Sequence, residues 1–131
     1  MKKIEPIKYR VQKEDKGYSA VSTIGETFIG TDGSTYDELV SNVLEATNLA
    51  LEGEGVDYSA DNISFEYDLD SFFHFYKVLN VKALSERIGM NQSLLAQYIK
   101  GNKKPSPTQT RRILKGVQQI GKELAEVSFL L

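Results

Sequence analysis

The chain has 131 residues, of which 40% are hydrophobic and 26% charged, so it suits one ordinary domain or two small ones and has the composition of a folded protein. It contains no cysteine and a single histidine, which argues against a disulfide framework, a thiol nucleophile or a zinc site. We therefore expect no metal and no cofactor. No apolar run approaches the roughly 20 residues of a membrane span, so we expect a cytoplasmic protein without membrane contact.

The charges are divided unequally along the chain, whose net charge is −2. Up to Asp70, six basic and fifteen acidic residues give a charge of −9. From Ser71 onward, ten basic and three acidic residues give a charge of +7. An asymmetry of this size indicates two modules with different partners, and the basic module is the one suited to nucleic acid.

The first part of the chain has the pattern of a sheet. Ile7, Tyr9 and Val11 alternate with polar residues, which is the period of a half-buried strand. A similar alternation starts at Tyr18, and turn-forming residues separate the alternating stretches. We predict a three-stranded antiparallel meander with strands near residues 7–12, 18–23 and 27–29.

A helix and a fourth strand are expected next. The alternation breaks at residues 31–34, and Thr35 with Glu38 forms a capping box. Apolar residues then recur every three or four positions as far as Gly53, a glycine stop. Residues 63–67 alternate again. Residues 1–69 are thus predicted to form an α+β domain of order β-β-β-α-β, with one helix packed on the sheet.

Residues typical of helix starts and ends dominate the rest of the chain, from residue 70 onward. Asp70 or Ser71 can cap a helix that carries Phe72, Phe73, Tyr76 and Leu79. Three more helices are expected. Gly89 ends the first of them, Asn91 and Gly101 bound the second, and Ser106 caps the third, with Pro107 at its first helical position. Residues 70–131 are therefore predicted to form an all-α domain.

Residues 81–100 have the pattern of a helix-turn-helix. Leu84 and Ile88 are placed to face the first helix, Gly89 can adopt the left-handed turn, and Met90 can fill the corner. The exposed face near the start of the third helix would then read base edges in the major groove. The predicted base-contacting residues are Gln92, Ser93, Ala96 and Gln97. The predicted phosphate-contacting residues are Lys82, Lys100, Lys103, Lys104, Arg111 and Arg112.

This half of the chain resembles the lambda-repressor-like helix-turn-helix family, including the run Tyr98-Ile99-Lys100-Gly101 followed by Lys104-Pro105-Ser106. The resemblance implies that the third helix enters the major groove of a double-stranded operator. One departure is Ser85, where the family usually has alanine.

The first half resembles HicB-type antitoxins, in the stretches Lys16-Gly17-Tyr18-Ser19-Ala20 and Gly33-Ser34-Thr35-Tyr36-Asp37-Glu38-Leu39. These antitoxins join a degenerate ribonuclease-H-like domain to a DNA-binding domain. The resemblance implies a type II antitoxin that neutralises a small HicA-like ribonuclease toxin and represses its own operator. The segment 23–27 lacks the Pro-Asp-Leu-Pro-Gly-Cys-like stretch that the family often carries. The candidate toxin-binding residues are Asp32, Asp37, Glu38 and Glu45.

Other interpretations remain open. The chain can be a stand-alone transcriptional regulator whose first domain dimerises or senses a ligand. Either regulator would work as a homodimer or higher homo-oligomer, because a single helix-turn-helix contacts few bases. A metal-dependent nuclease built on Asp68 and Asp70 is a third class. We expect no enzyme and no catalytic residue, and we interpret His74 as structural.

Overall fold

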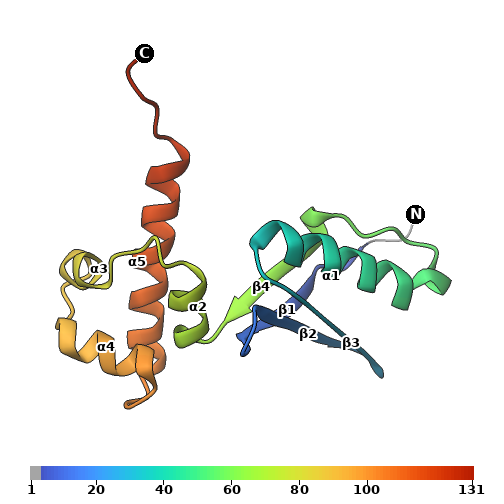
Figure 1. Cartoon of the computed structure of the whole chain (residues 1–131), viewed down its shortest axis with the longest axis horizontal. Helices are drawn as coiled ribbons and strands as arrows, with labels where there is room; N and C mark the ends of the chain where they lie inside the picture. The colour runs from blue at the N-terminus through green and yellow to red at the C-terminus, as the bar shows by residue number, and fades with distance from the viewer. Residues whose placement is uncertain (1–3) are drawn as a thin grey trace. The chain divides into compact units, whose positions relative to one another are not determined.

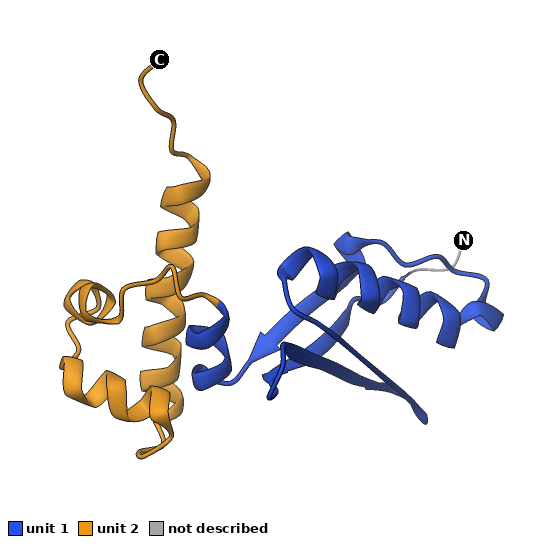
Figure 2. Ribbon diagram, in the orientation of Figure 1, with its two compact units in different colours: residues 1–75 blue, residues 76–131 orange. Residues whose placement is uncertain are grey.

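The computed structural model describes residues 4–131, which form an α+β protein with a four-stranded mixed sheet and five α-helices (Figure 1). The chain divides into two compact units, residues 1–75 and 76–131 (Figure 2). This division lies beyond the expected boundary between residues 69 and 70. Because residues 71–75 carry no formal charge, the net charges of the two units are still −9 and +7.

The sheet of the first unit has the order β3-β2-β1-β4. β1 (Ile7–Lys13) pairs antiparallel with β2 (Tyr18–Ile24), which pairs antiparallel with β3 (Thr27–Gly33). β4 (Ile63–Tyr67) lies parallel to β1, with Tyr9 opposite Phe65. The prediction that the third strand stops before Thr31 was wrong. β3 continues to Gly33 because it pairs along the whole length of β2, with Gly33 opposite Tyr18.

One helix, α1 (Tyr36–Ala50), packs on one face of the sheet, and the core of the unit lies between them. Thr35 caps the helix, as predicted, by accepting a hydrogen bond from the backbone N–H of Glu38 at 3.2 Å. The helix ends at Ala50 instead of continuing to Gly53, which lies in a short 3₁₀ turn (Glu52–Glu54). A second 3₁₀ turn, Ala60–Asn62, leads into β4.

A buried hydrogen bond joins α1 to β1, one of the two central strands of the sheet. The hydroxyls of Tyr9 and Thr47 are 2.6 Å apart, and both residues are fully buried. Thr47 also donates to the carbonyl oxygen of Val43. Burial raises the pKa of the Tyr9 hydroxyl above its ordinary value. The hydrogen bond gives each of the two buried hydroxyls a partner.

Helix α2 (Leu69–Phe75) belongs to the first unit because it is fastened to the end of the sheet. The backbone N–H of Lys13 donates to Ser71 Oγ at 3.0 Å, and the Lys13 ammonium lies 2.8 Å from a carboxylate oxygen of Asp70. The Tyr18 hydroxyl lies 2.6 Å from Nδ1 of His74. These contacts explain why the unit extends to residue 75 and give His74 a structural partner.

The second unit contains α3 (Val81–Arg87), α4 (Gln92–Lys100) and α5 (Pro107–Ala125). Asn91 caps α4 and Ser106 caps α5, with Pro107 at the first helical position, as predicted. Leu84, Leu95 and Ile113 are buried, one from each helix. Tyr76 and Leu79, expected on a helix with Phe72, lie beyond the end of α2. No helix within residues 4–131 is long and apolar enough to cross a bilayer.

Candidate nucleic-acid interface

The corner between α3 and α4 is a tight turn built on Gly89. Its φ of +65° lies in the left-handed region that favours glycine. The backbone N–H of Met90 donates to the carbonyl oxygen of Ser85 at 2.9 Å, which closes the end of α3. Met90 is only 6% exposed, so its side chain fills the corner. Ser85 is also buried, and its hydroxyl donates to the carbonyl oxygen of Lys82.

Helix α5 stabilises this corner through hydrogen bonds from Arg112. The guanidinium of Arg112 donates from Nε to the carbonyl oxygen of Ile88 at 3.0 Å and from Nη2 to that of Gly89 at 2.8 Å. These carbonyls lie at the end of α3, where helical partners are missing. A β-carbon at Gly116 would overlap Cγ2 of Ile88, so glycine allows α5 to approach α3 closely. The turn is therefore fixed by both a cation and a close helix contact.

A bidentate ion pair joins the other end of α5 to α3. The two terminal nitrogens of Arg87 lie 2.9 and 2.8 Å from the two carboxylate oxygens of Glu123. Gln119 donates to the same carboxylate at 3.2 Å. The hydrogen bonds from Arg87 and Gln119 lower the pKa of Glu123 to about 2. Arg87 is thus a structural cation within the basic unit.

Helix α4 turns one side into the unit and leaves its first turn in solvent. Leu95 is completely buried, whereas Gln92 and Ser93 are exposed. Ala96 and Gln97 lie further along the helix and are half-buried. The four predicted base-contacting residues thus differ in solvent exposure. The amide of Gln92 and the hydroxyl of Ser93, at the start of α4, are the most available for hydrogen bonding.

The predicted phosphate-contacting residues are all exposed. They come from the start of α3, the end of α4, the loop between α4 and α5, and the first turns of α5. Five of them form no ion pair or hydrogen bond through their side chains within the described part of the chain: Lys82, Lys100, Lys103, Lys104 and Arg111. Arg112 instead braces the turn. The carbonyls that Arg112 braces and the carboxylate that pairs with Arg87 lie more than twenty residues away, so no local sequence signal indicated either role.

The acidic candidates of the first unit lie at separate places. Asp37 and Glu38 are in the first turn of α1, where the positive end of the helix dipole stabilises negative charge. Glu45 lies seven residues after Glu38, about 10 Å along the same helix. Asp32 is on β3, on the side of the strand opposite the buried Ile29. All four are exposed, but they do not form one compact cluster on α1.

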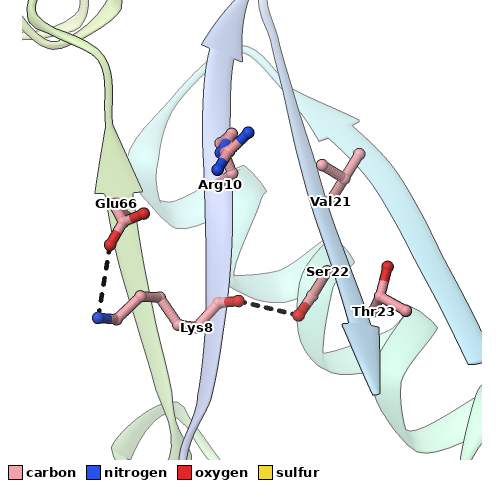
Figure 3. Close-up of a pocket in the computed structure, with 6 residues that line it drawn as sticks. All are labelled: Lys8, Arg10, Val21, Ser22, Thr23 and Glu66. Carbon is pink, nitrogen blue, oxygen red and sulfur yellow. Dashed lines mark hydrogen bonds and ion pairs between the residues drawn. The ribbon is translucent and has the colours of Figure 1, made fainter. Parts of the chain in front are cut away.

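The face of the sheet opposite α1 carries a shallow pocket of about 390 Å³ (Figure 3). It is lined by Lys8, Arg10, Val21, Ser22, Thr23 and Glu66. Lys8 lies 3.4 Å from Glu66, and the Ser22 hydroxyl donates to the carbonyl oxygen of Lys8 at 2.9 Å. Both charged side chains are more than half exposed, so the ion pair is screened by water.

The two aspartates considered for a nuclease have structural roles. Asp68 accepts hydrogen bonds from the backbone N–H and the hydroxyl of Ser71, at 2.7 and 3.1 Å, and so caps α2. Asp70 pairs with Lys13.

Comparison with known proteins assigns neither unit: no family model, no curated protein and no solved structure matches this chain.

Proposed function

We propose that the second unit is a helix-turn-helix domain that binds double-stranded operator DNA. The observation that carries the proposal is the corner at Gly89, which joins α3 to α4 and leaves Gln92 and Ser93 exposed at the start of the second helix. A helix presented by such a turn can enter the major groove with its first residues toward the bases. The net charge of +7 supports the same proposal, because phosphate contacts supply much of the affinity for DNA.

In this proposal α4 is the recognition helix. Gln92 and Gln97 have amides that can form paired hydrogen bonds with adenine, and Ser93 can donate to either base of a pair. Lys103 and Lys104 follow the helix in an exposed loop, where they can contact the phosphates beside the groove. Lys82 stands near the start of α3 and can contact the backbone on the other side of the corner.

Selection from random duplexes tests the proposal. The full chain is incubated with a pool of randomised 30-base-pair duplexes, and bound DNA is recovered and sequenced over several rounds. We expect one enriched sequence, arranged as an inverted repeat if two copies bind. Recovery of an unselected pool would contradict base reading by α4. Absence of binding even at 50 mM salt would contradict DNA binding altogether.

We also propose that the first unit neutralises a small basic ribonuclease toxin, as an antitoxin would. The support is its charge of −9 and the exposure of its acidic candidates, since complementary potentials speed encounter and select partners. Asp37, Glu38 and Glu45 are presented by one helix, which a basic surface can follow. Asp32 would contribute from the neighbouring strand.

Co-expression with the product of a small neighbouring reading frame tests this second proposal. We expect a stable complex that dissociates more readily at high salt, and a toxin that arrests growth when produced alone. Glu38→Lys and Glu45→Lys together should weaken the complex, whereas Glu126→Lys in the basic unit should not. A chain that binds DNA but captures no toxin would favour a stand-alone regulator.

A further inference from the structure

A row of four residues crosses the face of the sheet opposite α1, which we call the open face. Gly30, Val21, Arg10 and Glu66 follow one another from β3 to β4, each opposite the next in the strand register. Residues opposite each other in neighbouring strands project from the same face. Arg10 therefore has an apolar neighbour on β2 and a carboxylate neighbour on β4, and a carboxylate is the partner that a guanidinium binds best.

The side chain of Arg10 nevertheless has no partner. The Glu66 carboxylate lies 3.4 Å from the ammonium of Lys8, and Figure 3 shows this pair alongside Arg10. Within residues 4–131 the Arg10 guanidinium forms no ion pair and no hydrogen bond. The first unit has fifteen acidic and only six basic residues, so a shortage of carboxylates does not explain an unpaired cation on one of its central strands.

A pocket lies beside Arg10, where the ladder between β1 and β2 ends. The last pair of this ladder is Arg10 with Val21, although both strands continue past it. Beyond that pair, the Ser22 hydroxyl donates to the carbonyl oxygen of Lys8 at 2.9 Å. The pocket of about 390 Å³ opens here, and the exposed Thr23 hydroxyl that lines it forms no hydrogen bond within the described chain. The pocket thus offers an unpaired cation and a free hydroxyl.

Apolar groups border the pocket on the side of β3. Phe28 lies opposite Thr23 in the register and is 66% exposed. A β-carbon on Gly30 would lie 3.1 Å from the ring of Phe28 and 3.6 Å from a methyl group of Val21, so both apolar side chains flank the open space above the glycine. An exposed ring next to an unpaired cation suits a ligand that has an apolar body and an anionic group.

The charges around the pocket select the anionic group. Lys8 and Glu66 are already paired, which leaves the single positive charge of Arg10 to be balanced. The planar guanidinium matches a carboxylate, to which it can donate two parallel hydrogen bonds. The charge of −9 on this unit repels a doubly charged phosphate or a nucleic acid more strongly than a singly charged carboxylate.

We propose that the open face of the sheet binds a small monocarboxylate that has an apolar body. Arg10 donates to both carboxylate oxygens, Thr23 donates to one of them, and Val21 and Phe28 contact the apolar body. These four residues form what we call the open-face site. All of them belong to the first unit, so the site requires neither the DNA binding nor the toxin binding proposed above and is measured without either partner.

Phenylacetate is the probe, because it joins a carboxylate to an aromatic ring. At the affinity per atom usual for small ligands, we expect a dissociation constant of about 1 mM. Titration of the isotope-labelled full chain, followed by the amide shifts in NMR spectra, measures this constant. Shifts should be concentrated in the strands that carry the open-face site. Phenylacetamide, which has the same shape without the charge, should bind at least roughly tenfold more weakly.

Arg10→Gln and Lys16→Gln are a matched pair of variants. Each removes one exposed positive charge from the first unit, but Lys16 lies in the turn between β1 and β2 and does not line the pocket. Arg10→Gln should raise the dissociation constant roughly tenfold, whereas Lys16→Gln should leave it unchanged. Glu66→Gln should lower it about threefold, because it frees Lys8 and removes a nearby negative charge.

Three results would each overturn the open-face site. They are an absence of amide shifts at about 20 mM phenylacetate, equal binding of phenylacetamide, and equal effects of Arg10→Gln and Lys16→Gln. The amide spectrum of each variant also shows whether its fold is retained. The comparison of phenylacetate with phenylacetamide uses the unmodified chain, so it decides the proposal even if a variant fails to fold.

Discussion

Arg112 Nη2 donates a hydrogen bond to the carbonyl oxygen of Gly89 at 2.8 Å, which joins the first turns of α5 to the corner between α3 and α4. The same guanidinium donates to Ile88. We expect Arg112→Ala to destabilise the second unit by about 1 kcal/mol, because two carbonyl groups at the end of α3 lose a charged donor and regain only water. In a small domain this lowers the melting temperature by about 4–8 °C, which thermal unfolding followed by circular dichroism measures.

Arg111→Ala is the matched control for Arg112. Arg111 is the preceding residue of the same helix, and its side chain contacts no other described residue through a hydrogen bond or ion pair. It should lower DNA affinity without changing the melting temperature. Equal melting temperatures for Arg112→Ala and the wild type would show that the hydrogen bonds to the corner contribute nothing to stability.

The two glutamine amides of α4, exposed at Gln92 and half-buried at Gln97, lead to a prediction about sequence preference. Gln92→Ala and Gln97→Ala should each weaken binding to the selected duplex by about 1–3 kcal/mol, because each removes a hydrogen-bonding partner of a base. Binding to an unrelated duplex of the same length should be unchanged. Fluorescence anisotropy at constant salt measures both. Losses of equal size on the two duplexes would mean that these residues do not read bases.

The loop between α4 and α5 leads to a prediction about salt. Lys103→Ala and Lys104→Ala should weaken binding to the selected and the unrelated duplex alike, because phosphate contacts carry no sequence information. Each lost contact should also reduce the slope of log affinity against log salt by about 1. Anisotropy titrations between 50 and 200 mM salt give the slope. An unchanged slope would show that the two lysines point away from the DNA.

Local sequence signals predicted the parts of the fold that depend on neighbouring residues. The cap at Thr35, the caps at Asn91 and Ser106, and the left-handed turn at Gly89 each follow from one side chain and the backbone within a few residues of it. Such interactions can be recognised in a single sequence. The exposed start of α4 follows from them, because the turn and the cap fix where that helix begins.

Contacts between distant residues could not be predicted in this way. Arg112 and Gly89 are twenty-three residues apart, and nothing near Arg112 distinguishes a bracing arginine from a phosphate-contacting one. The attachment of α2 to the sheet depends on Lys13 and Ser71, which are fifty-eight residues apart. The domain boundary was therefore placed at a change in composition, before a helix that tertiary contacts assign to the first unit.

The ion pair between Arg87 and Glu123 leads to a prediction about acid. The folded protein holds the pKa of Glu123 at about 2, below its ordinary value of 4.5, so between these two values the unfolded chain binds more protons than the folded one. The contribution of the pair is present above pH 4.5 and is lost as the pH falls toward 2. Glu123→Gln should flatten the fall in stability of the second unit over this range, which urea unfolding at a series of pH values measures. Glu126→Gln is the control, because Glu126 is a nearby carboxylate without an ion pair in the described chain. It should leave the dependence of unfolding free energy on pH as it is in the wild type. If Glu123→Gln also left this dependence unchanged, the ion pair would be broken in solution.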